Sequence, residues 1–346
     1  MASFRSDNNS GLCPEALEAI TQSAGEYHIA YAHDGVTEQA QGMFQNIFGD
    51  KTRVFFMATG TAANVLAIAS LTEPWQRVIC HERSHLATSE SSAPERITGC
   101  RLSTISTGSS KLSHLDLKSI EDRVDNIQGV QPGVVTIANP TEFGEVYTPK
   151  QTEDICKTAN EMGYRVHVDG ARFACAVAHL GCDPRQLTVD AGVDAMTFGG
   201  AKNGLAIGEA VLFFHQGDGE DHARAVHRFP FLRKAAGHLV SKHRFLTAPF
   251  VASLKGNAWL KHAAYANKMA EKLSVGLIDA GYPPRFPTQA NGVFVSLPDH
   301  VHDALVGRHG YYILGAPAWK MARFLMSFDT DPRDVEAVIK DISDAG

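Results

Sequence analysis

The sequence lacks the features that mark secreted, membrane-spanning and nucleic-acid-binding proteins. It has no Cys-x-x-Cys pair, and six cysteines scattered over 346 residues indicate reduced, mostly buried thiols and a cytoplasmic setting. Its longest apolar run, near residues 62–71, is shorter than the roughly 18 residues that cross a bilayer. A net charge of −6 disfavours a nucleic-acid partner, because neutralising phosphates requires a basic surface. We therefore expect neither a membrane nor a nucleic acid as partner.

Apolar segments alternate with helix-like segments from about residue 50 to 215. Helical patterns cover Ala62–Ser70, Leu117–Asn126 and Thr152–Glu161. The apolar runs predict strands that are covered on both faces: Val54–Met57, Val78–Cys80, Val134–Ala138, Val166–Val168, Ala195–Phe198 and Ala210–Phe214. This alternation predicts an α/β fold with a mostly parallel sheet and helices on both sides.

The pattern changes after Phe214. A long helical region is expected from Asp221 to Glu271, with a break near Pro249. Short strands at Gly292–Ser296 and Phe324–Ser327 and a closing helix from Asp334 predict a smaller α+β domain. We divide the chain into an N-terminal segment (1–14), a large domain (15–250) and a small C-terminal domain (251–346).

A possible anion-binding turn lies in Met57-Ala-Thr-Gly-Thr-Ala-Ala-Asn64. A strand ends there, Gly60 and Thr61 turn the chain, and a helix is expected to begin at Ala62. The first N–H groups of a helix are unpaired and attract an anion such as phosphate. A plain helix cap by a threonine explains the same pattern.

Two further site candidates directly follow apolar strands. Asp169, in His167-Val-Asp-Gly-Ala-Arg172, is placed to pair with a cation such as a protonated pyridine nitrogen. A structural role explains the aspartate equally well: it could cap the next helix and form an ion pair with Arg172. Lys202, in Phe198-Gly-Gly-Ala-Lys-Asn-Gly204, is flanked by small residues that leave space around its amine. Forming an imine with an aldehyde would remove the charge that burial penalises, whereas a surface lysine in a glycine turn is the ordinary alternative.

The order of these three groups along the chain indicates a particular cofactor more specifically than any one group does. Pyridoxal phosphate (PLP) needs a phosphate anchor, a partner for its ring nitrogen and a lysine for its aldehyde. The chain supplies the three groups in this order: Gly60 with Thr61 as the anchor, then Asp169 as the partner, then Lys202 as the lysine. We therefore predict a PLP enzyme.

The chain resembles the low-specificity threonine aldolases, PLP enzymes of the aspartate-aminotransferase-like fold, over nearly its whole length. The resemblance rests on these segments: Phe4-Arg-Ser-Asp-Asn-Asn-Ser-Gly11 with Pro14-Glu15, Thr59-Gly-Thr-Ala-Ala-Asn64, Glu82-Arg-Ser-His85, Ala93-Pro-Glu-Arg-Ile-Thr-Gly99, His167-Val-Asp-Gly-Ala-Arg172, Gly200-Ala-Lys-Asn-Gly204 and Ala322-Arg-Phe324. It implies cleavage of a β-hydroxy-α-amino acid (L-threonine, L-allo-threonine or a phenylserine-like compound) to glycine and an aldehyde. It also implies a PLP-binding large domain and an N-terminal segment that contributes to the active site.

The resemblance also implies roles for single residues. His85 would stack on the pyridine ring and take the proton of the substrate hydroxyl. Arg172 would bond the phenolic oxygen of the ring and, with Arg323 and Ser6, grip the substrate carboxylate. The family is oligomeric, so a homodimer or homotetramer is expected, with Tyr31 acting across the interface.

Three segments depart from the family pattern. Thr141 or Glu142 stands where many members have a histidine near the substrate hydroxyl. Lys242 is our candidate for an arginine that reaches the phosphate in many members, and the usual Tyr-Gly-Asp reads Tyr31-Ala-His-Asp34. These departures concern the side-chain preference of the enzyme rather than its reaction type.

Other functions remain open at this stage. The same fold and cofactor could perform β-elimination or transamination, or serve a non-catalytic PLP-binding protein. His81-Glu-Arg-Ser-His85 matches the H-E-x-x-H pattern of zinc hydrolases, which requires both histidines on one helical face. Here it directly follows the predicted strand Val78–Cys80, so we expect no metal site.

Overall fold

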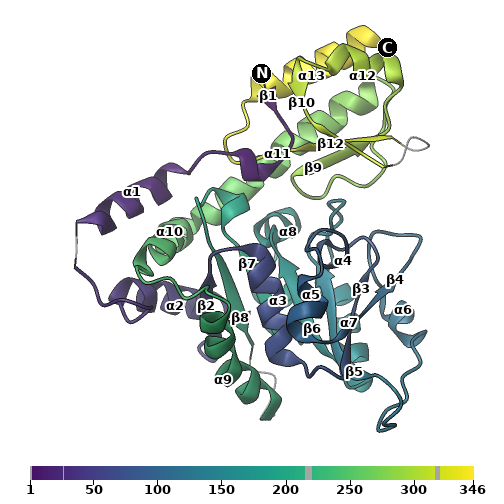
Figure 1. Ribbon diagram of the computed structural model, residues 1–346. Helices are drawn as coiled ribbons and strands as arrows, with labels where there is room; N and C mark the ends of the chain where they lie inside the picture. Colours follow the sequence, from purple (N-terminus) through teal and green to yellow (C-terminus); the bar gives the residue numbers. More distant parts are fainter. Residues whose placement is uncertain (1, 26, 215–219, 316–319) are drawn as a thin grey trace.

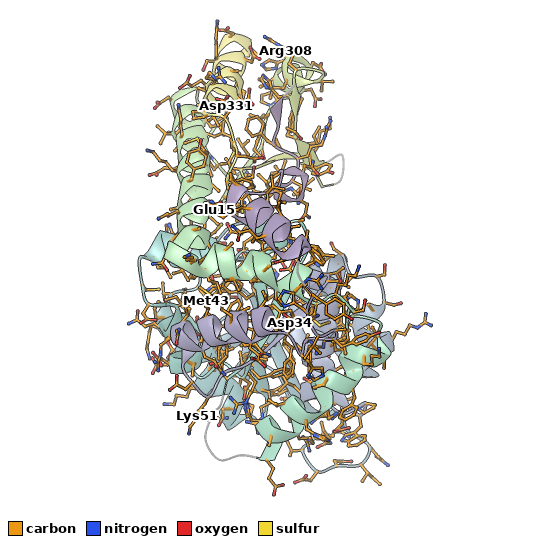
Figure 2. All side chains as sticks on the ribbon, turned by 90° about the vertical axis from the view of Figure 1, so that its left-hand side faces the viewer. Glu15, Asp34, Met43, Lys51, Arg308 and Asp331 are labelled. Carbon is orange, nitrogen blue, oxygen red and sulfur yellow. The ribbon has the colours of Figure 1, made fainter. Side chains whose placement is uncertain are left out.

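The computed structural model describes residues 2–25, 27–214, 220–315 and 320–346. A layered unit with a central sheet occupies one end of the molecule, and a smaller unit that holds both chain termini occupies the other (Figure 1). Figure 2 shows Glu15 between the layered unit and the small unit, which Arg308 and Asp331 mark. None of the helices in these described ranges has the length and hydropathy of a membrane span.

The central sheet has seven strands in the order β2-β8-β7-β6-β5-β3-β4. Its strands are β2 (Arg53–Met57), β3 (Gln76–His81), β4 (Arg101–Ile105), β5 (Gln131–Ala138), β6 (Arg165–Gly170), β7 (Ala195–Gly199) and β8 (Glu209–Phe213). β8 runs antiparallel to both of its neighbours, and the other neighbouring pairs are parallel. The predicted α/β fold with a mostly parallel sheet is confirmed.

Helices cover both faces of this sheet (Figure 1). One face carries α3 (Gly60–Leu71), α5 (Ala93–Thr98) and α9 (Glu220–Ala235). The other face carries α2 (Gly35–Phe48), α7 (Pro149–Glu161), α8 (Phe173–Leu180) and α10 (Arg244–Leu254), with α1 (Pro14–Ala24) packed on α10. Two short helices, α4 (His85–Thr88) and α6 (His114–Lys118), lie between β3 and β5 in sequence. Adjacent strand residues such as Val134 and Val135 point into the two different cores on opposite faces of the sheet. Both faces are therefore buried, which is why the strands are continuously apolar.

An aromatic cluster fills the core between the sheet and α2. The fully buried Phe44 lies with its ring centroid 5.1 Å from that of Phe198, 5.8 Å from that of Phe250 and 6.0 Å from that of Phe56. All six cysteines are free and five are buried, as the sequence predicted.

The small unit is built around an antiparallel sheet in the order β11-β12-β9. Its elements are α11 (Ala258–Asp279), β9 (Gly292–Val295), α12 (Asp299–Leu305), β10 (His309–Gly310), β11 (Tyr312–Leu314), β12 (Met321–Leu325) and α13 (Pro332–Ala345). The N-terminal strand β1 (Ala2–Ser3) pairs with β10, and Phe4 is buried in the small core. Helix α11 belongs to both units, because Trp259 lies in the large core and Leu273 lies in the small core. The domain boundary at residue 250 therefore stays a prediction.

Some predicted elements were wrong. The helix expected at Leu117–Asn126 is only the five-residue α6, which starts at a Ser113–Asp116 capping box; turns follow, with Asp125 at a positive φ of 61°. The break expected at Pro249 is absent, because that proline lies inside α10. The long helical region is instead interrupted at Gly237 (φ 77°) and Gly256 (φ 63°), which adopt the left-handed conformation that ends helices.

We predict that Phe44→Ala lowers the free energy of unfolding by about 3–5 kcal/mol, because it leaves a cavity in the aromatic cluster. Guanidinium unfolding of the two proteins measures this difference. Ile127→Ala, at a fully exposed position, should change little. Equal stability of Phe44→Ala and the wild type would contradict this description of the core.

Candidate active site

The carboxyl ends of β2, β6 and β7 lie at one edge of the sheet, and each leads into a predicted site segment. A cavity of about 480 Å³ opens there. Its wall includes most of the residues predicted from sequence: Gly60, Thr61, His85, Thr141, Asp169, Arg172 and Lys202. Groups far apart in the sequence therefore meet around one cavity, as ligand sites in α/β sheets do.

The N-terminus of α3 forms the anion cradle. The helix begins at Gly60, two residues earlier than expected, and Thr59 caps it by accepting a hydrogen bond from the Ala62 N–H at 3.3 Å. The N–H groups of Gly60 and Thr61 are among the four at a helix start that have no acceptor within the helix. A methyl group built on Gly60 would meet only Glu209 Oε1, at 3.8 Å, so the cradle has room for an anion.

Asp169, at the end of β6, is held in place by two hydrogen bonds. Its Oδ1 accepts from the Ala171 N–H at 3.0 Å, and its Oδ2 accepts from Asn64 Nδ2 at 2.9 Å. Behind it, the fully buried His167 has a pKa lowered to about 4, mainly by burial. A neutral His167 leaves the carboxylate without a cationic partner beneath it, so Asp169 is available to a cation in the cavity.

Lys202 lies in a short 3-10 helix, η4 (Ala201–Asn203), directly after β7. The small flanking residues were expected to leave space for the amine, and two of the glycines also have a backbone role. A methyl group on Gly200 would lie 2.5 Å from the Gly208 carbonyl oxygen, and Gly204 has a φ of 93° with Cys13 2.9 Å from its Cβ position. These glycines therefore allow the backbone around Lys202 to pack tightly against its neighbours.

His85, at the start of α4, is part of a hydrogen-bonded network. Its Nδ1 lies 2.9 Å from Oε1 of Glu90, whose side chain is fully buried. Asn64 Nδ2 donates to the same oxygen at 3.2 Å and to Asp169 at 2.9 Å. A carboxylate at Nδ1 favours the tautomer with its proton there, which leaves Nε2 as an acceptor.

Arg172 forms a bidentate ion pair with Asp7, in the short 3-10 helix η1 (Asp7–Asn9). Arg172 Nε donates to Asp7 Oδ2 at 2.6 Å and Nη2 donates to Oδ1 at 2.8 Å. Burial by itself would raise the pKa of Asp7, but the charge and hydrogen bonds of Arg172 outweigh it, and the pKa is lowered. Asn291 adds a third hydrogen bond to this carboxylate at 3.0 Å.

Ser6 and Arg323 lie beside this ion pair, although neither is among the residues that line the cavity. Ser6 Oγ accepts from the Asn8 N–H at 3.2 Å. Arg323 donates to the Arg5 carbonyl oxygen at 3.1 Å, and its Nε has no partner in the described ranges. Burial and the charge of Arg172 both lower the pKa of Arg323, so the two guanidinium groups are close enough to repel each other.

Thr141 and Glu142, which stand where many family members have a histidine, occupy another part of the cavity wall. The Thr141 hydroxyl lies 2.8 Å from Ser110 Oγ. Glu142 Oε1 accepts from the backbone N–H of His85 at 2.5 Å, and burial raises its pKa to about 7.

The structure does not bring Tyr31 or Lys242 to this cavity. Lys242 is exposed, and the half-exposed Tyr31 ring lies 4.8 Å from Lys234 Nζ. Their predicted roles at a neighbouring subunit stay predictions.

The H-E-x-x-H match is not a helical metal motif. His81 is the last residue of β3, whereas His85 begins α4. His81 Nδ1 accepts from the Arg83 N–H, and its Nε2 lies 3.1 Å from the Ser109 carbonyl oxygen. Both ring nitrogens are thus used within the chain.

Sequence reasoning missed four polar residues that hold this site: Asp7, Asn64, Glu90 and Glu209. Asn64 lies one turn after Gly60 in an otherwise apolar helix, and Glu209 begins an apolar strand, so both positions could have been noticed as exceptions. Asp7 and Glu90 lie in polar segments, where nothing in the local pattern distinguishes them.

The fold agrees with the comparisons to known proteins. The chain belongs to the beta-eliminating lyase family, whose model matches residues 3–299. It is 41% identical over 343 residues to the low specificity L-threonine aldolase of Pseudomonas sp. (strain NCIMB 10558), covering 98% of this chain and 96% of the relative. The solved threonine aldolase of Leishmania major superposes with a TM-score of 0.92 at 26% identity, covering 99% of this chain and 98% of that one. The resemblance to threonine aldolases is confirmed.

We predict that Asp7→Asn lowers the free energy of unfolding by about 3–5 kcal/mol at pH 7, because it leaves Arg172 without its buried partner. Since the pKa of Asp7 is lowered in the folded protein, its stabilising effect exists above its ordinary pKa and is lost as the pH falls through the lowered value. The difference between the two proteins should therefore shrink below about pH 4. Urea unfolding across pH tests this, with the exposed Asp344→Asn as control; a difference independent of pH would contradict it.

Proposed function

We propose that this protein is a PLP-dependent aldehyde-lyase that cleaves a β-hydroxy-α-amino acid, such as L-threonine, to glycine and an aldehyde. One observation carries the proposal: the anion cradle, Asp169 and Lys202 line one cavity in a chain that is 41% identical to low specificity L-threonine aldolases. The predicted reaction, cofactor and enzyme class agree with this family.

The residues present fit the cofactor. The free N–H groups of Gly60 and Thr61 would hold its phosphate, Asp169 would pair with its ring nitrogen, and Lys202 would bond its aldehyde carbon. When bound, PLP supplies an electron sink for the electrons of the Cα–Cβ bond. The Asn64 and Ala171 hydrogen bonds keep the Asp169 carboxylate oriented toward that role.

The arginine pair provides a site for the substrate carboxylate. Arg172 and Arg323 together carry two positive charges, and Asp7 compensates only one of them. A second carboxylate, supplied by the substrate, would balance the other charge, with Ser6 as an additional hydrogen-bond donor. A guanidinium can bind a carboxylate through two parallel hydrogen bonds, which a lysine cannot reproduce.

His85 is placed to act as the base for the β-hydroxyl proton. The Glu90 carboxylate at Nδ1 leaves Nε2 free to accept that proton as the Cα–Cβ bond breaks. Thr141, held by Ser110, offers a hydroxyl to the same end of the substrate.

The active form is proposed to be a homodimer or homotetramer in the cytoplasm. Large apolar side chains that are exposed on the single chain support this proposal: Tyr27, Ile29, Tyr31 and Phe231. Tyr31 and the exposed Lys242 would then reach the cavity of a neighbouring subunit.

β-Elimination and transamination use the same fold and cofactor but give other products. We predict that the PLP-loaded protein releases glycine and an aldehyde in equal amounts from L-threonine, L-allo-threonine or phenylserine. Quantifying glycine, aldehyde, pyruvate, ammonia and 2-oxo acid in each reaction distinguishes the three reactions. Lys202→Ala should abolish turnover and the colour of the bound cofactor, whereas the exposed Lys150→Ala should retain both. Pyruvate without glycine would contradict aldol cleavage.

We predict that Glu90→Gln lowers kcat by roughly 100-fold and leaves KM nearly unchanged, because an amide can donate to Nδ1 and so place the imidazole proton on Nε2. Steady-state kinetics across pH measure both constants. Glu95→Gln, exposed on α5, is the matched control. A wild-type kcat in Glu90→Gln would exclude the His85–Glu90 pair from catalysis.

A further inference from the structure

Glu209 is a buried carboxyl group at the bottom of the cavity. It is the first residue of β8, whose other residues are apolar and fully buried. Only 6% of Glu209 is exposed, yet it lines the same cavity as the anion cradle and Lys202. A buried acid in an apolar strand is costly unless its charge is compensated or removed by a proton.

The carboxyl group lies between the two parts of the cofactor site. Glu209 Oε2 accepts a hydrogen bond from the Gly200 N–H at 2.8 Å, two residues before Lys202. Its Oε1 lies 3.8 Å from the position that a Cβ on Gly60 would occupy. Glu209 therefore bonds the lysine loop on one side and faces the first residue of the anion cradle on the other.

Two side chains of opposite charge, Lys202 and Asp169, act on the Glu209 carboxyl group. Burial raises the pKa of Glu209 to about 7, Lys202 opposes this increase, and Asp169 adds to it. Its partners on the neighbouring strands, Met57 and Gly199, are uncharged. Gly60 and Thr61 of α3, which line the same cavity, are also uncharged.

We propose that Glu209 couples loading of the cofactor to the uptake of one proton from solvent. This proposal rests on the proposed function. A phosphate dianion at Gly60 brings negative charge next to the Glu209 carboxyl group, which can then be accommodated only in its neutral, protonated form. Above neutral pH the free protein must first protonate Glu209, so cofactor affinity falls as the pH rises.

Binding of pyridoxine 5′-phosphate tests the proposal without any reaction at Lys202, because this compound has the ring and the phosphate but no aldehyde. We compare its dissociation constant for the wild type with that for Glu209→Gln. The ratio of the first to the second should rise about tenfold between pH 6 and pH 8, because only the wild type has to protonate Glu209. Calorimetry at pH 8 in two buffers of different ionisation enthalpy should show that the wild type takes up close to one proton more than Glu209→Gln does. Pyridoxine, which lacks the phosphate, should show neither effect.

Two controls keep the outcome decisive. Glu73→Gln, beyond the other end of α3, should keep the wild-type pH dependence. If Glu209→Gln does not fold, Glu209→Ser takes its place in both measurements. A ratio that does not change with pH, or equal proton uptake by the two proteins, would overturn the role of Glu209, whereas failure of the wild type to bind PLP at any pH would overturn the proposed function itself.

Discussion

Charge compensation inside a partly buried cavity is the constraint on which this active site depends. Asp7, Asp169, Glu90 and Glu209 supply negative charge, while Arg172 and Lys202 supply positive charge. None of these groups can be buried cheaply alone, and partners on other elements hold Asp7, Asp169 and Glu90 in place. In the proposed complex, a ring cation would supply the partner that Asp169 lacks, and the phosphate would be accommodated beside a protonated Glu209.

The N-terminal segment connects this charge network to the small unit. β1 pairs with β10, Phe4 fills the small core, and three residues further on Asp7 holds Arg172. A shift of the small unit would therefore move Arg323, on β12, and Asp7, the ion-pair partner of Arg172. This link explains how a short segment without a core of its own can hold Arg172 at the edge of the cavity.

The sequence was sufficient to predict those site residues whose positions follow from the order of the strands. Parallel strands place their carboxyl ends at one edge, so the cradle at Gly60, Asp169 and Lys202 could be assigned to one site from apolar runs and turns. It was insufficient where partners come from distant segments. Nothing near Glu90 indicates that it contacts His85, and Asp7 could be joined to Arg172 only through the fold. Tyr31 and Lys242 are exposed on the single chain, so their roles depend on a second subunit.

In the proposed enzyme, groups from three strand ends bind one PLP, and Lys202 is bonded to it. Reduction of the PLP-loaded protein with borohydride, followed by peptide mass spectrometry, identifies the bonded lysine. We expect one phosphopyridoxyl group per chain, attached to Lys202. A phosphopyridoxyl group on another lysine, or none at all, would contradict this assignment.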